Sequence, residues 1–158
     1  MSTDAPILQH STLMNRLVLE RNTADDLGRV DQLWLDCKAH QILGLSCKSG
    51  FLGRKRRGFT WAQIEAIGDE SVLVSLADDG NATKPEEAEI PLNHEVWSDD
   101  GNRAGRVVDY RFNRETGDVV DYLFSSNGWA GATNGIYRLD PTAVISVGSK
   151  RMIVRKAA

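Results

Sequence analysis

The sequence predicts an all-β protein built from two tandem small antiparallel β-barrels with short helical turns. Three observations in the 158 residues lead to this prediction. Two ordered landmarks occur twice, apolar and polar side chains alternate after the first landmark, and turn-forming residues separate short apolar runs. Alternation with a period of two is typical of strands that bury one face.

The landmarks indicate an internal duplication. A Gly-Arg-Val tripeptide at residues 28–30 recurs at residues 105–107, which is 77 positions later. A pattern of two apolar residues followed by glycine at residues 64–68 recurs at residues 144–148, which is 80 positions later. Because both landmarks keep their order at a nearly constant offset, we expect two copies of one small domain.

The duplication divides the chain into four predicted parts. They are a flexible N-terminus at residues 1–13, without a visible secretory signal, a first barrel at 14–77, a linker at 78–89 and a second barrel at 90–158. The linker carries five acidic residues and one lysine, whereas acidic and basic residues nearly balance in each barrel. Since neither barrel is strongly basic, we expect no specific nucleic-acid binding.

Alternation and turn residues assign the elements within each copy. In the first copy, Leu33 and Leu35 are expected on the buried face, opposite Trp34. The residues expected on the equivalent face of the second copy are Val108, Tyr110 and Phe112. Gly117 suits a positive φ in a hairpin loop at residues 113–118.

Helical turns are expected to follow the hairpins. Thr60 and Gln63 have the spacing of a capping box, which starts a short helical turn. In the second copy, Asp140 is a favourable N-cap and a proline follows it at the first helical position.

Composition and reactive residues favour a protein without a catalytic site. Hydrophobic residues make up 41% of the chain and charged residues 26%, as in an ordinary globular protein. Cys37 and Cys47 are expected to be buried, reduced and unpaired, and no metal or cofactor site is expected. His94 has no evident serine or cysteine partner, so we expect no enzyme.

The repeated landmarks resemble the PRC-barrel family, and the resemblance covers nearly the whole chain. The segments that carry it are residues 28–36, 44–45, 61–68, 105–113 and 144–148. The Gly- and Arg-rich segment 49–57, followed by Phe-Thr-Trp, is similar to tandem PRC-barrel proteins of cyanobacteria and plastids. The resemblance implies a mostly antiparallel barrel, no enzymatic activity and a docking surface.

Known members of the family imply three kinds of docking. The photosynthetic reaction centre H subunit stabilises a membrane photosystem, RimM binds a ribosomal protein during assembly, and archaeal stand-alone members are adaptors in cell division. This chain lacks the transmembrane helix of the H subunit, and it has a second PRC-like copy where RimM has a different N-terminal barrel.

Several side chains are candidates for partner binding. Residues 54–57 form the densest basic run, which is either a solvated hairpin tip or a contact for an acidic partner or an anionic membrane surface. Trp34 lies either between the barrels or on an exposed interface. Trp129 sits in a Gly-rich loop that is either a flexible hairpin loop of the second copy or a binding loop with Trp129 as its anchor. The full candidate set is Trp34, Phe51, Leu52, Arg54, Lys55, Arg56, Arg57 and Trp129.

These features together predict a non-catalytic adaptor or assembly factor that docks onto a large complex. The resemblance favours photosynthetic membrane machinery, with the protein in the cytoplasm or peripheral on the thylakoid membrane. The alternatives are RimM-like ribosome maturation and a small-ligand carrier. Barrels of this size are normally filled by side chains, which disfavours the carrier.

Overall fold

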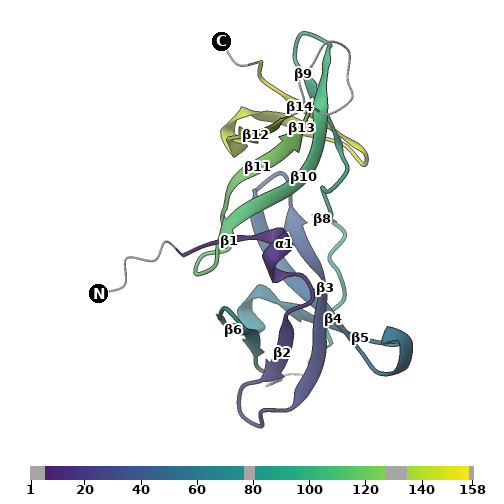
Figure 1. Ribbon diagram of the computed structural model, residues 1–158, viewed down its shortest axis with the longest axis vertical. Coiled ribbons are helices and arrows are strands. Elements are labelled where there is room, and N and C mark those ends of the chain that lie inside the picture. Colours follow the sequence, from purple (N-terminus) through teal and green to yellow (C-terminus); the bar gives the residue numbers. More distant parts are fainter. Residues whose placement is uncertain (1–5, 77–80, 127–134, 157–158) are drawn as a thin grey trace.

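The computed structural model describes residues 6–76, 81–126 and 135–156 as two β-sheets of seven strands each. The sheets follow one another along the long axis of the molecule, with the earlier residues in one half and the later residues in the other (Figure 1). The prediction of an all-β fold is confirmed. No helix in the described part of the chain is long and apolar enough to cross a membrane.

The two sheets have equivalent strand orders. The first sheet contains, in spatial order, β5 (Lys55–Thr60), β4 (Gln41–Ser49), β3 (Asp26–Asp36), β2 (Leu17–Glu20), β7 (Ser71–Val74) and β6 (Ile64–Ile67), with β8 (Ala88–Glu89) added on β3. The second contains β12 (Ile136–Leu139), β11 (Val119–Ser125), β10 (Arg103–Asn113), β9 (Glu95–Ser98), β14 (Arg151–Val154) and β13 (Val144–Val147), with β1 (Ile7–Gln9) added on β10. The short helices are α1 (His10–Leu13), η1 (Phe51–Gly53), η2 (Trp61–Gln63) and η3 (Pro141–Ala143).

Pairing within each sheet is mostly antiparallel, but each sheet has one parallel pair. These pairs are β2 with β7 and β9 with β14, where the first and last strands of each copy meet. Each copy is therefore mostly antiparallel, as the resemblance implies, with one parallel pair. In the described strands, no pairing joins β5 to β6 or β12 to β13, so each sheet is open along its hydrogen-bonded path.

A β-bulge at the same place in both copies corrects the expected side-chain alternation. The register shifts between Val30 and Gln32 in β3, and between Val107 and Asp109 in β10. Val107 is therefore fully buried, whereas Val108 is 42% exposed, although the alternation predicted it inside. An extra residue at a bulge reverses the face of the residues before it, and this cannot be read from a period of two alone.

The turn predictions are confirmed. Gly117 has a φ of 80° in the β10–β11 loop, and helical turns η2 and η3 follow Thr60 and Asp140. The backbone N–H of Thr60 donates to Gln63 Oε1 at 2.9 Å, and Thr142 N–H donates to Asp140 Oδ1 at 2.9 Å. Side-chain oxygens nearby in the sequence thus accept hydrogen bonds from backbone N–H groups that have no backbone acceptor at these helix starts.

Each sheet takes its seventh strand from outside its own copy. Strand β1 precedes the first copy but pairs with β10 of the second, and β8 lies at the end of the linker but pairs with β3 of the first. Residues 7–13, which form β1 and α1, are called the strap here, and they lie where the two sheets meet (Figure 1). The predicted flexible N-terminus is therefore wrong for these residues, since Leu13 is completely buried.

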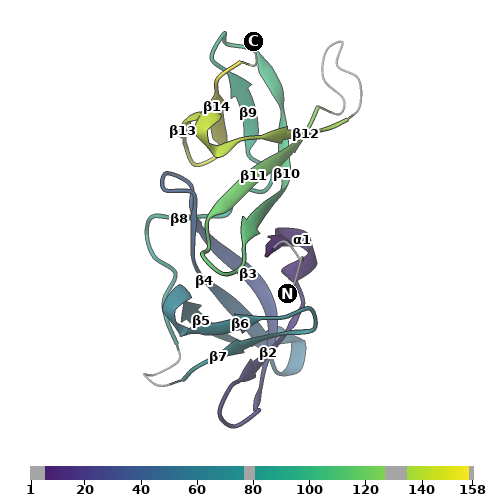
Figure 2. The same ribbon diagram turned by 90° about the vertical axis from the view of Figure 1, so that its left-hand side faces the viewer.

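The hairpins of the two copies also meet through reciprocal hydrogen bonds. Ile42 N–H donates to the carbonyl of Gly117 at 2.8 Å, and Val119 N–H donates to the carbonyl of His40 at 2.9 Å. Ile42 and Val119 are 77 residues apart, and so are His40 and Gly117. This is the offset between the two Gly-Arg-Val landmarks. The contact is therefore self-complementary, like that between the subunits of a twofold-symmetric dimer. Figure 2 shows the β10–β11 hairpin reaching the first sheet.

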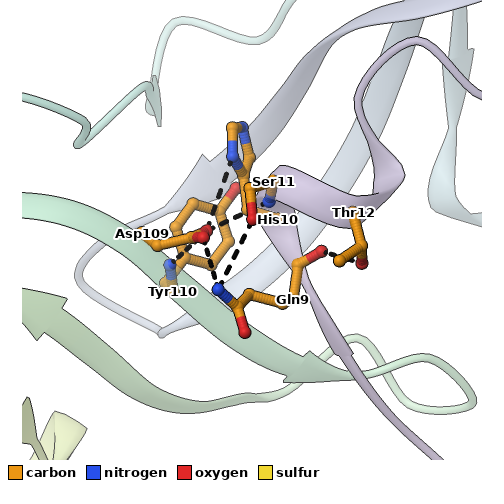
Figure 3. A network of polar contacts seen from close by, with 6 residues as sticks. All are labelled: Gln9, His10, Ser11, Thr12, Asp109 and Tyr110. Carbon is orange, nitrogen blue, oxygen red and sulfur yellow. Dashed lines mark hydrogen bonds and ion pairs between the residues drawn. The ribbon is translucent and has the colours of Figure 1, made fainter.

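A buried polar network fixes the strap against the second copy (Figure 3). The carboxylate of Asp109 accepts a hydrogen bond from Gln9 Nε2 at 2.6 Å and another from the backbone N–H of Ser11 at 3.1 Å. The imidazole of His10 lies 3.8 Å from the same carboxylate and packs against the ring of Tyr110 at 5.0 Å between centroids. Asp109 is only 6% exposed, so the network is a specific anchor rather than a surface contact.

Acidification is expected to weaken both the strap network around His10 and the hairpin contact at His40. Burial lowers the pKa of His10 and of His40 below the ordinary value of 6.5, although Asp109 raises the first and Asp36 and Asp140 raise the second. The unfolded chain therefore binds protons more readily than the native chain does. The contribution of these two histidines to the free energy of unfolding is fully present above about pH 6.5. It falls as the pH drops below about 6.5, by at most about 1.4 kcal/mol per pH unit for each proton.

Thermal unfolding between about pH 7.5 and pH 5.5 measures this dependence, in a range above most carboxylate titrations. The double variant His10→Gln/His40→Gln should show a flatter profile than the unaltered protein. Equal slopes for the two proteins would contradict the assignment of the acid sensitivity to these histidines.

Candidate docking site

A projecting hairpin carries most of the predicted binding residues. Strands β4 and β5 pair as far as Ser49 and Lys55, and the turn between them extends away from the first sheet (Figure 1). Gly50, Leu52 and Gly53 all have positive φ, with values of 79°, 58° and 64°. Leucine seldom adopts this conformation, so the turn holds Leu52 in an uncommon backbone geometry.

The turn exposes two large apolar side chains beside two cations. Phe51 is 78% exposed and Leu52 is 75% exposed, the highest values among the large apolar residues that the structure describes. Arg54 and Lys55 follow them, are also exposed, and form no ion pair with any described residue. These four residues are called the basic tip.

Of the two remaining members of the basic run, Arg56 differs from the cations of the basic tip because it forms an ion pair. Arg56 Nη2 lies 3.0 Å from Oδ2 of Asp31, and Lys48 Nζ lies 3.9 Å from the same oxygen. Ser46 Oγ donates to the other oxygen of Asp31 at 2.6 Å, which fixes the carboxylate on the outer face of the sheet. Arg56 is therefore partly neutralised, whereas Arg57, which is exposed, has no ion pair with a described residue.

Trp34 lies neither between the copies nor on an exposed interface. It is 3% exposed and lies on the outer face of β3, where its ring covers Gly44 and Gly58 of the neighbouring strands. The linker crosses above it, and the backbone N–H of Ala82 donates to the carbonyl of Gly58 at 2.8 Å. Both expected positions of Trp34 are therefore corrected, because the linker buries a ring that the strand pattern leaves outside.

Of the other residues singled out in the sequence, the structure describes the two cysteines but not Trp129. Trp129 and nearly all of its Gly-rich loop lie outside the described residues. Cys37 and Cys47 are free and buried, as expected, and burial raises the pKa of their thiols to about 12 and about 11. Both thiols are therefore protonated at neutral pH and are poor nucleophiles. In the described residues, no group of three or more His, Cys, Asp or Glu side chains is arranged to hold a metal.

Sequence reasoning missed the residues that act across the copies. Asp109, His10 and Gln9 form the anchor of the strap, and His40 Nδ1 lies 2.7 Å from the hydroxyl of Tyr122. These partners are 82 to 100 residues apart in the chain. An acidic residue in the middle of an apolar strand is the one signal at Asp109 that could have drawn attention to it.

The arrangement defines a class of protein: two equivalent small β-modules, joined through a self-complementary contact, with an apolar and basic tip on one of them. Residues 88–158 match the family model of the PRC-barrel domain, so the chain carries a PRC-barrel domain over its second copy. The first copy has the same strand order but lies outside the match. No curated protein matches the chain.

Proposed function

We propose that this protein is a non-catalytic adaptor that docks onto a large complex through the basic tip. The observation that carries this proposal is the exposure of Phe51 and Leu52 beside the unpaired charges of Arg54 and Lys55. Exposed aromatic and apolar anchors flanked by cations are typical of surfaces that bind a partner. A PRC-barrel domain at residues 88–158 supports a protein-interaction role in general.

The partner that we propose is the photosynthetic membrane machinery, on the basis of the resemblance of residues 49–57 to tandem proteins of cyanobacteria and plastids. The protein then works in the cytoplasm, peripheral on the thylakoid membrane, as an assembly factor. Ribosome maturation remains the second candidate, because the PRC-barrel domain also occurs in RimM. Fully buried side chains such as Leu45 and Tyr122 fill the cores that the two sheets enclose. This supports docking over ligand transport.

Cross-linking in a native lysate, followed by fractionation into membrane, ribosome and soluble pools, tests the proposal. We expect the unaltered protein in the membrane pool, cross-linked to photosystem subunits. The variants Phe51→Ser/Leu52→Ser and Arg54→Gln/Lys55→Gln should each lower this association by at least about tenfold, since truncating a hot-spot anchor costs about 2 kcal/mol or more and tenfold corresponds to about 1.4 kcal/mol.

Ile145→Ser is the matched control, because Ile145 is 50% exposed but lies on β13 of the other copy. It should leave the association unchanged. Co-sedimentation with small ribosomal subunits, lost in the same tip variants, would replace the photosynthetic partner with the ribosomal one. Undiminished association of both tip variants at low salt would refute docking through the tip.

A further inference from the structure

A hollow of about 420 Å³ lies on the outer face of the first sheet, apart from the basic tip. Its floor is a row across three strands, in which Gln32 of β3 pairs with Ser46 of β4, and Ser46 pairs with Gly58 of β5. Trp34 forms one part of the lining. The linker at residues 81–84 forms the rim, held to β5 by the hydrogen bond from Ala82 to Gly58.

The side chains around this hollow are cationic. Arg56, Arg57 and Lys84 line it, and none of the described residues that line it carries a carboxylate. The carboxylate of Asp31 lies beside the floor, where it accepts a hydrogen bond from Ser46, and it balances Arg56. Arg57 and Lys84 form no ion pair with any described residue, so about two positive charges at the hollow are unbalanced among the residues that the structure describes.

Two neutral hydrogen-bonding groups in the lining are also without a described partner. The Nε1–H of Trp34 is buried and has no acceptor, although an indole N–H can only donate. A buried donor without an acceptor destabilises the protein, so an acceptor at this position would be stabilising. The amide of Gln32, which also lines the hollow, has no hydrogen bond to another described side chain.

We propose that this hollow binds the phosphate group of a phosphomonoester. A phosphomonoester carries close to two negative charges at neutral pH, which match the charges of Arg57 and Lys84. A guanidinium binds phosphate through paired hydrogen bonds, and the indole of Trp34 and the amide of Gln32 supply further donors. A carboxylate would leave one cation unbalanced. The volume exceeds that of a phosphate alone and leaves room for a small attached group.

Titration of the full chain with glycerol 3-phosphate and with inorganic phosphate tests this site. The readout is the indole N–H signal of Trp34 in proton–nitrogen NMR spectra, assigned with the variant Trp34→Phe. We expect a saturable shift of this signal, because a new acceptor changes the hydrogen bonding of Nε1. Arg57→Gln/Lys84→Gln should weaken binding at least about tenfold.

Arg54→Gln/Lys55→Gln is the matched control, since it also removes two positive charges and lies on the hairpin that carries Arg57, but outside the hollow. It should change the affinity by less than about threefold, the effect of general charge alone. No saturable shift of Trp34, or equal weakening in both double variants, would overturn the proposal. These variants also separate the hollow from the tip, because docking to the large complex depends on Arg54 and Lys55.

Vesicles distinguish a lipid headgroup from a soluble phosphomonoester. Phosphatidylcholine vesicles with and without phosphatidic acid are sedimented with the protein. Where the Trp34 signal also shifts, vesicle binding that requires phosphatidic acid, and that Arg57→Gln/Lys84→Gln removes, supports the site with a lipid as its source. A shift of Trp34 with glycerol 3-phosphate but no vesicle binding supports the site with a soluble source. Absence of both refutes it.

Discussion

Replacing Gly28 with alanine is expected to lower the free energy of unfolding by at least about 3 kcal/mol, which combines backbone strain with steric overlap. Gly28 has a φ of 119°, a conformation that residues with a side chain rarely adopt. A Cβ atom there would lie 2.1 Å from the carbonyl oxygen of Lys48 on the paired strand β4. Neither atom can move without breaking the β3–β4 ladder. Urea unfolding of the two proteins measures the loss.

The chain offers controls that separate the two causes. Gly101 has a φ of 86°, and a Cβ atom there would have no neighbour within 4 Å, so Gly101→Ala should cost only the backbone strain of about 1–2 kcal/mol. Gly105, the equivalent of Gly28, lacks the positive φ, but its Cβ would lie 2.3 Å from the carbonyl oxygen of Ser125. If Gly28→Ala were no more harmful than Gly101→Ala, close approach would not be the reason for glycine in this landmark.

Replacing Leu13 with alanine is expected to cost about 2–5 kcal/mol, as for other fully buried leucines. Leu13 ends the strap, is completely buried and belongs to the core cluster that includes Leu8 and residues of both copies. The variant leaves a cavity between the sheets and weakens the attachment of β1 to β10. Urea unfolding and protection of the β1 amides from hydrogen exchange measure the two effects.

Ser11→Ala is the control for Leu13→Ala, because the side chain of Ser11 is exposed and its backbone N–H still donates to Asp109. It should change stability by less than about 0.5 kcal/mol. A flexible N-terminus, as the sequence predicts, would instead make both replacements harmless. Equal and small effects would therefore show that the strap does not stabilise the protein.

Features that depend on neighbours in the chain could be predicted from the sequence. The repeated Gly-Arg-Val landmark, the helix starts at Thr60 and Asp140 and the positive φ at Gly117 each follow from a few adjacent residues. The duplication itself is a comparison of the sequence with itself. The exposed basic tip was also within reach, since Phe51 and Leu52 precede a run of cations in a turn.

Features that depend on distant partners were decided only by the tertiary structure. The bulge before Asp109 turned Val108 outward, and the linker covered Trp34, which the strand pattern leaves outside. The strap became ordered because β1 pairs with a strand about 100 residues later and Asp109 binds its backbone. Local sequence thus determined which segments form strands and turns. Hydrogen bonding and burial between segments far apart in the chain determined which faces and ends are covered, and these interactions leave no local pattern to read.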